Sequence, residues 1–128
     1  MRGPAIVILA VDSVERAVAF YKTAFGGTET ITSPSYVELD MGNVRLGLYE
    51  RAAFGQNIGR IAAGLPPGDI SRTELYFRVD DLDEATRKLE AAGARLLSGA
   101  QRRPWGETAA YYADPDGNVV AIAVNELA

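Results

Sequence analysis

The fold is decided by a stretch that occurs twice, as ILAVDSVERAVAFYKTAFGG at residues 8–27 and as YFRVDDLDEATRKLEAAGAR at residues 76–95. When the copies are aligned without gaps, Val11 falls on Val79 and an aspartate follows each valine. Each copy begins with an extended apolar run and continues with apolar residues at helical spacing. We therefore expect an internal duplication, with a strand followed by a helix in each half of the chain.

The two expected helices carry start and stop signals. Ser13 and Asp81 stand where a side-chain oxygen can accept a hydrogen bond from the free amides of the first helical turn. Gly26 and Gly93 suit the left-handed conformation that commonly ends a helix. These signals bound one helix in each copy.

A second pair of similar segments follows the helices, SYVELDMGNVRLGLYE at residues 35–50 and AYYADPDGNVVAIAVN at residues 110–125. A Gly-Asn pair falls at the same place in both segments. Each segment is typical of a hairpin, with a strand, a tight glycine turn and a second strand. This alignment makes Tyr36 the counterpart of Tyr111.

With a weaker strand expected near residues 28–33 and another near 94–100, each half contains a strand, a helix and three further strands. The expected fold class is α+β, a single domain of two βαβββ modules that takes in all 128 residues. The first module spans about residues 4–50 and the second about 73–126. The linker between them, about 51–72, holds four glycines and a Pro-Pro pair, which indicate a flexible connection and a candidate lid.

The composition excludes several classes of function. The chain has no cysteine and no histidine, which excludes disulfides, thiolate metal sites and the commonest general base at neutral pH. A net charge of −4, from 13 basic and 17 acidic residues, argues against a nucleic-acid partner. The apolar N-terminal run favours a strand over a signal peptide, and no run is long enough to span a membrane. We expect a cytoplasmic protein with no membrane partner.

The chain resembles the vicinal oxygen chelate superfamily in three segments: VDSVERAVAFYKTAFGG, FRVDDLDEATRKLEAAGA and PWGETAAYYADPDGNVVAIAV. This superfamily includes glyoxalase I, the extradiol dioxygenases, the fosfomycin-resistance enzymes and the bleomycin-resistance proteins. The resemblance covers nearly the whole chain outside the linker, and the DPDGN turn after Trp-Gly is its most specific part. It implies an eight-stranded mixed sheet that curls into a ligand-binding cup, and a homodimer whose modules are often swapped.

The resemblance also locates four places at which enzymes of this superfamily hold a divalent metal ion. In this chain they fall on Ile6, Leu46, Glu74 and Ala121. Isoleucine, leucine and alanine have no lone pair to donate, and a single carboxylate does not hold a hard cation tightly. We therefore expect no metal and no cofactor. A slip of one residue in the strand register would move these side chains to the opposite face.

Alternation along the strands predicts which side chains line the cup. They are Ile6, Ile8, Tyr36, Glu38, Leu46, Leu48, Glu74, Tyr76, Arg78, Tyr111, Ala121 and Ala123, and together with Trp105 they form the predicted ligand-binding set. The set is mostly apolar and aromatic with a few charges, which is typical of small-molecule pockets. Tyr112 should instead point toward the helix.

The aromatic residues and the arginines near them each have two interpretations. Trp105 can stack on a planar ligand ring, or it can cover the edge of the core or a dimer contact. Tyr36 and Tyr111 can sandwich a flat ligand, or they can be ordinary strand residues. Arg102 and Arg103 are expected in a solvated loop, with contact to an anionic ligand as the alternative.

The two carboxylates of the predicted set are also open to two interpretations. Glu74 and Glu38 could neutralise a cationic ligand or, with a pKa raised by desolvation, act as a general base. The alternative is a salt bridge with Arg78 or Arg45, or simple exposure to solvent.

These features favour a binding protein close to the metal-free, bleomycin-resistance-like members of the superfamily. We expect a homodimer that sequesters a hydrophobic or planar natural product or antibiotic. The alternative is a metal-independent enzyme, such as an isomerase, epimerase, cyclase or lyase, with Glu74 or a tyrosine as its acid or base. A third interpretation is an interaction domain with a vestigial cup.

Overall fold

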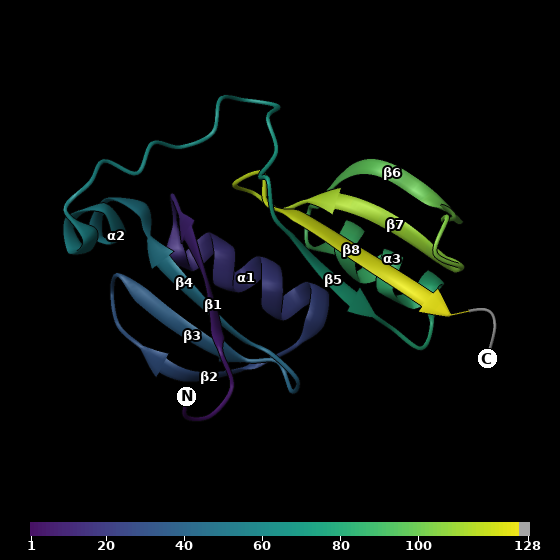
Figure 1. Ribbon diagram of the computed structural model, residues 1–128, viewed down its shortest axis with the longest axis horizontal. Helices are drawn as coiled ribbons and strands as arrows, with labels where there is room; N and C mark the ends of the chain where they lie inside the picture. Colours follow the sequence, from purple (N-terminus) through teal and green to yellow (C-terminus); the bar gives the residue numbers. More distant parts are fainter. Residues whose placement is uncertain (126–128) are drawn as a thin grey trace. The chain divides into compact units, whose positions relative to one another are not determined.

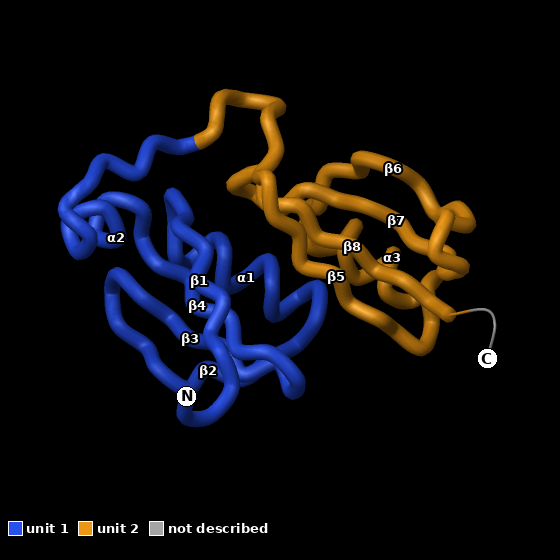
Figure 2. Tube along the Cα trace, in the orientation of Figure 1, with its two compact units in different colours: residues 1–64 blue, residues 65–128 orange. Residues whose placement is uncertain are grey.

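The computed structural model describes residues 1–125 and contains two compact units, one of residues 1–64 and one that begins at Leu65 (Figure 2). Each unit holds a four-stranded sheet, and in each the helix that follows the first strand packs against the sheet (Figure 1). The boundary between the units falls within the glycine- and proline-rich segment that the sequence marks as a linker.

The first unit follows the expected strand-helix-three-strand order. Its elements are β1 (Ile6–Val11), α1 (Val14–Phe25), β2 (Thr28–Thr32), β3 (Tyr36–Asp40), β4 (Arg45–Glu50) and α2 (Arg51–Ile58). The strands lie in the order β1-β4-β3-β2, with β1 parallel to β4 and the other pairs antiparallel. The crossover through α1 is what allows β1 and β4 to run in parallel.

The second unit repeats this topology. Its elements are β5 (Glu74–Arg78), α3 (Leu82–Ala91), β6 (Arg95–Arg102), β7 (Glu107–Ala113) and β8 (Val119–Asn125). The strands lie in the order β5-β8-β7-β6, with β5 parallel to β8. The predicted fold class is confirmed: the protein is α+β and is built from two βαβββ modules with mixed sheets.

The predicted N-caps are confirmed, whereas Gly26, which ends α1, has φ +80° and ψ −135° and so does not adopt the left-handed helical conformation expected of it. The Ser13 side chain accepts a hydrogen bond from the amide of Arg16 at 3.1 Å, and this bond caps α1. The amide of Glu84 donates to Asp81 at 3.0 Å and caps α3 in the same way. Gly93, just after α3, has a φ of +85°, which a residue with a side chain rarely adopts.

Each helix covers one face of its own sheet, and the core of each unit lies between them. The core residues of the first unit are Leu9, Val11, Val14, Ala17, Phe20, Tyr21, Ala24, Val37, Leu39, Leu46 and Leu48. Those of the second unit include Ala85, Leu89, Ala110, Tyr112, Val120 and Ile122. Tyr112 therefore points toward the helix, as predicted.

The segment expected as a linker is not irregular throughout. It begins with helix α2, which the sequence analysis did not predict and whose first amides, those of Ala52 and Ala53, donate to the side chain of Glu50. Residues 59–73 contain no helix or strand. Across residues 1–125, no helix combines the length and the apolar character that crossing a membrane requires.

Candidate functional site

Each sheet has one face covered by its helix and one opposite face, which we call the open face. In the first sheet, Gly47 of β4 pairs with Ile8 of β1 and with Glu38 of β3. Paired residues on neighbouring strands point to the same side of a sheet, so these three positions share a face. Alternation adds Ile6 and Tyr36 to it. Ile6 and Ile8 are each 44% exposed, which identifies this face as the open one.

Leu46 and Leu48 do not lie on this open face, so the prediction for both residues was wrong. Leu46 pairs with Leu39, and Leu48 pairs with Val37. All four are buried on the helix-covered face, and Leu46 and Leu48 are 1% and 0% exposed. They belong to the core and not to a ligand-binding surface.

The error arises from the different lengths of the two hairpin turns. The turn between β3 and β4 is closed by a hydrogen bond from the amide of Met41 to the carbonyl of Val44. The turn between β7 and β8 is closed from Asp114 to Asn118 and is therefore one residue longer. An alignment that sets the two turn glycines against each other shifts β4 by one residue, and such a shift reverses the face of every side chain.

The register also changes which residues of the two modules correspond. Tyr111 pairs with Ala121 in the second sheet as Glu38 pairs with Gly47 in the first. The counterpart of Tyr111 is therefore Glu38, and the predicted equivalence of Tyr111 with Tyr36 was wrong. The counterpart of Ala121 in β4 is Gly47.

On the first open face, a buried carboxylate is held by a tyrosine and an arginine. Tyr36 donates its hydroxyl hydrogen bond to Glu38 Oε2 at 3.0 Å, and Arg45 Nη1 lies 3.5 Å from Glu38 Oε1. Glu38 is only 3% exposed. The salt-bridge interpretation of Glu38 is therefore confirmed. Burial, together with the neighbouring carboxylate, raises the pKa of Tyr36 to about 12.

Gly47 gives the Tyr36 ring the room it needs. A Cβ atom at this position would lie 2.5 Å from Tyr36 Oη and 2.8 Å from Tyr36 Cε1. We expect Gly47→Ala to push the ring away, destabilise the protein by about 1–3 kcal/mol and return the Tyr36 pKa toward the ordinary value of 10.0. Thermal unfolding and a tyrosinate absorbance titration measure the two effects. Gly99→Ala is the matched control because a Cβ atom there meets nothing within 4 Å.

The second open face holds six of the predicted residues. In one row, Ala121 of β8 lies between Tyr76 of β5 and Tyr111 of β7. In the next row, Ala123 is paired with Arg78. Glu74 belongs to the same face by alternation. For this module the predicted strand faces were therefore right.

A residue that the sequence analysis missed, Glu107, organises this face. Its Oε1 accepts a hydrogen bond from the Tyr76 hydroxyl at 2.8 Å, and its Oε2 accepts one from Arg78 Nε at 2.7 Å. Because Glu107 is on β7 and its partners are on β5, its side chain spans β8, where Ala123, the partner of Arg78, is small. Alternation from Tyr111 places position 107 on the open face and could have identified this residue.

Neighbouring groups keep the Glu107 carboxylate ionised and the Tyr76 phenol protonated. Hydrogen bonds from Arg78 and Tyr76 hold the pKa of Glu107 below its ordinary value. Burial raises the pKa of the Tyr76 phenol, so that the phenol stays protonated and donates to the carboxylate. Glu107 is thus an ionised acceptor that fixes two neighbours, and it is not poised to act as a base.

Trp105 lies in the β6–β7 turn and borders the same open face. Its Nε1 donates a hydrogen bond to the Tyr76 hydroxyl at 2.9 Å, and the two rings meet edge to face with centroids 6.3 Å apart. Trp105 is nevertheless 55% exposed. The indole is held in place without being covered by the core.

Arg103 and Glu74 are two further charged groups on this face. The Arg103 guanidinium lies 4.8 Å above the ring of Tyr111 and donates hydrogen bonds to backbone carbonyls, so it is fixed and does not belong to a solvated loop. Glu74 is exposed and forms no hydrogen bond or ion pair within residues 1–125. The salt bridge considered between Glu74 and Arg78 is absent, because Arg78 pairs with Glu107.

The described residues do not offer a donor set for a divalent metal ion. With the register corrected in β4, the open-face positions equivalent to metal ligands are Ile6, Gly47, Glu74 and Ala121. Only Glu74 among them has a donor atom, and a divalent cation requires several. Nor does any other group of three carboxylates in residues 1–125 lie close enough to hold one.

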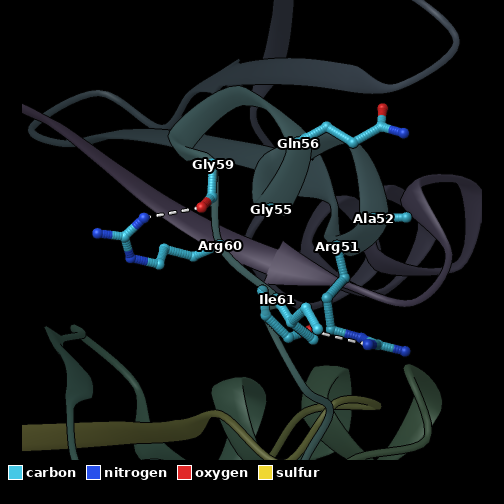
Figure 3. A pocket seen from close by; sticks show the side chains of 8 residues that line it. Arg51, Ala52, Gly55, Gln56, Gly59, Arg60 and Ile61 are labelled. Carbon is cyan, nitrogen blue, oxygen red and sulfur yellow. Dashed lines mark hydrogen bonds between the residues drawn. The ribbon is translucent and has the colours of Figure 1, made fainter.

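The first unit also contains a hollow of about 670 Å³ beside α2 (Figure 3). None of the predicted site residues lines it. Both of its arginines are already committed: Arg51 pairs with Asp12 at 2.7 Å and donates to the carbonyl of Ala62, and Arg60 donates to the carbonyl of Gly59. The open face of the second sheet is therefore the stronger candidate site.

The chain is similar in sequence to known proteins over most of its length. Residues 4–122 match the sequence profile of the Glyoxalase/Bleomycin resistance protein/Dioxygenase superfamily. The chain is 26% identical over 116 residues to metallothiol transferase FosB of Lysinibacillus sphaericus (strain C3-41), covering 88% of this chain and 74% of that protein.

Two solved structures are similar over nearly the whole chain. A glyoxalase/bleomycin resistance protein/dioxygenase family enzyme from Burkholderia phytofirmans PsJN has a TM-score of 0.82 and 26% identity, over 94% of this chain and 96% of that one. A glyoxalase-related enzyme from Fulvimarina pelagi has a TM-score of 0.81 and 25% identity, over 98% of this chain and 89% of that one.

Proposed function

The chain belongs to the Glyoxalase/Bleomycin resistance protein/Dioxygenase superfamily, and from this membership we propose that it is a small-molecule binding protein. It holds a hydrophobic or planar natural product or antibiotic against the open face of the second sheet, in the cytoplasm and without a metal ion. In this it resembles the metal-free, bleomycin-resistance-like members of the superfamily.

The observation that carries the proposal is the fixed but exposed indole of Trp105. The hydrogen bond to Tyr76 orients the ring, while 55% of the residue remains available to a ligand. A ring that is already oriented loses little side-chain entropy when a ligand stacks on it. Each favourable stack contributes about 0.5–1.5 kcal/mol beyond the buried area, and Tyr111 offers a second ring on the same face.

The residues at the metal-ligand positions support a function without a metal. FosB, to which the chain is similar, is named a metallothiol transferase, but this chain has glycine and alanine where β4 and β8 face the open side. Small residues there supply no donor atoms for a metal ion. Ala121 and Ala123 are completely buried, so the exposed aromatic surface on this face comes from the side chains around them, above all Trp105.

We expect titration with planar, apolar natural products to quench the fluorescence of Trp105, the chain's one tryptophan, with a Kd of tens of micromolar or tighter, about −6 kcal/mol or better. Excess EDTA should leave the Kd unchanged. Trp105→Phe is the matched control: the signal disappears, while calorimetry still detects binding. Failure of every compound to bind, or binding that requires an added divalent cation, would contradict the proposal.

A catalytic role is the second candidate, and the exposure of Glu74 favours it. This carboxylate lies on the open face and forms no hydrogen bond or ion pair within residues 1–125, so it is available to take a proton from a bound substrate. If the protein is an enzyme, Glu74→Gln should reduce turnover at least about a hundredfold while the ligand still binds. Turnover equal to that of the wild type would exclude Glu74 from the chemistry.

The proposal includes a homodimer, as expected from the superfamily. Ile6 and Ile8 support it, since both are apolar and 44% exposed in the single chain. Sedimentation equilibrium at micromolar concentration should give twice the mass of one chain.

A further inference from the structure

Two arginines on the open face of the second sheet are fixed in the same unusual way. Arg78 donates through Nε and Nη2 to Glu107, at 2.7 and 3.3 Å, and its guanidinium lies 5.6 Å from the ring centre of Tyr76. One edge of the guanidinium is thus committed to a carboxylate, and the side chain is still 71% exposed.

Arg103 repeats this arrangement with neutral acceptors. Its Nε and Nη2 donate to the carbonyl of Ala109 at 3.2 and 3.0 Å, and Nη2 also donates to Ser98 Oγ and to the carbonyl of Gly99. The guanidinium lies 4.8 Å above the ring centre of Tyr111. Since none of these acceptors is charged, the positive charge of Arg103 is not neutralised by a hydrogen-bonded partner.

In both side chains the remaining nitrogen, Nη1, is uncommitted. Within residues 1–125, neither Arg78 Nη1 nor Arg103 Nη1 donates a hydrogen bond. The rings beneath the two guanidinium groups, Tyr76 and Tyr111, lie in one row with Ala121 between them. Two strand spacings, about 10 Å, separate the backbone positions that carry these rings. The open face therefore offers a flat aromatic row with a fixed donor at each end.

From this geometry we propose that the ligand is an anionic aromatic compound, a planar ring system that carries a carboxylate, sulfonate or phosphate. The ring lies along Tyr76, Trp105 and Tyr111, and the anionic group accepts hydrogen bonds from Arg103 Nη1. A guanidinium group suits a carboxylate, sulfonate or phosphate because it is always charged and its remaining N–H groups form charge-assisted hydrogen bonds. This inference rests on the proposed binding function and names its ligand class.

The charges on this face favour Arg103 over Arg78 as the anion contact. Arg78 is balanced by Glu107, whereas Arg103 is anchored by carbonyls and a hydroxyl. The exposed carboxylate of Glu74 also acts on this row: burial and the charge of Glu74 raise the pKa of Tyr111, so Arg103 must outweigh this repulsion for an anion to bind. Arg78 can still donate hydrogen bonds to the ligand, but its positive charge is balanced by Glu107.

A matched pair of fluorescent probes tests the inference. 1-Anilinonaphthalene-8-sulfonate and N-phenyl-1-naphthylamine share one ring skeleton, and only the first carries an anionic group. We expect the sulfonate to bind the protein roughly tenfold more tightly than the neutral probe at low salt. Its advantage should shrink in 1 M salt, where the screening length falls to about 3 Å.

Variants separate this inference from the proposed function. Arg103→Gln should weaken sulfonate binding roughly tenfold and leave the neutral probe unchanged, whereas Arg87→Gln on α3 should change neither. Equal affinity of the two probes, or an equal loss of both in Arg103→Gln, overturns the anionic ligand while the binding function stands. If neither probe nor any planar natural product binds, the proposed function fails, and this inference fails with it.

Discussion

Truncation of Leu46 to alanine is expected to lower the free energy of unfolding by about 2–5 kcal/mol. The side chain is 1% exposed and lies on the helix-covered face of the first sheet, where it is paired with Leu39. Removing its methyl groups leaves a cavity between the sheet and α1, because a packed core relaxes only in part. Since small domains are stable by only about 5–15 kcal/mol, urea denaturation should show a large shift of the midpoint.

The matched control for this prediction is Leu96→Ala. Leu96 is a strand leucine of β6 but is 59% exposed, so its truncation should change the free energy of unfolding by no more than about 0.5 kcal/mol. A small loss for Leu46→Ala, accompanied by weaker ligand binding, would place Leu46 back on the open face. Ligand affinity equal to that of the wild type supports the core assignment.

The contrast between Leu46 and Ala121 shows what limits prediction of strand faces from sequence. The repeat and the helix caps are local signals, and they were sufficient for the two βαβββ modules. The phase of a strand after a turn depends on the number of residues in that turn, and the first hairpin is shorter by one. Two turns that share a Gly-Asn pair look alike in sequence, although their hydrogen-bond closure differs. The face of β4 was therefore reversed, whereas that of β8 was right.

The candidate site could be predicted only in part from the sequence. The reason differs from the one that applies to the face of β4. Tyr76, Arg78 and Trp105 were identified by alternation and residue type, but the group that joins them was not. Glu107 is 31 residues from Tyr76 in sequence, and the two meet only because β8 lies between their strands. No local pattern encodes that meeting.

The alanines of β8 have their explanation in the same network. A larger side chain at Ala123, which pairs with Arg78, would crowd the ion pair that Glu107 makes across β8. Both alanines are completely buried although they lie on the open face. The sequence analysis attributed Ala121 to the loss of a metal ligand. The geometry adds that Ala121 lies between Tyr76 and Tyr111.

Replacement of Glu107 by alanine is expected to weaken binding of planar ligands by about tenfold or more. Without the carboxylate, Tyr76 loses its acceptor and Arg78 loses its ion pair, so both side chains gain rotational freedom. The indole of Trp105, which donates to the Tyr76 hydroxyl, then loses its orientation. A ligand must order these three side chains on binding, and that ordering costs affinity. Calorimetric titration measures the loss directly.

Acid pH provides an independent test of the same residue. Because Arg78 and Tyr76 hold the pKa of Glu107 below its ordinary 4.5, the folded protein keeps this carboxylate ionised at pH values where the unfolded chain already protonates it. Its stabilising contribution is present above pH 4.5 and is lost as the pH falls through the lowered folded pKa. The melting temperature of the wild type should therefore fall more steeply below pH 4.5 than that of Glu107→Gln.

Glu84→Gln is the control for this pH test. It removes an exposed ion pair with Lys88 and should follow the wild-type curve. Parallel curves for the wild type and Glu107→Gln would show that Glu107 does not hold the aromatic row in place.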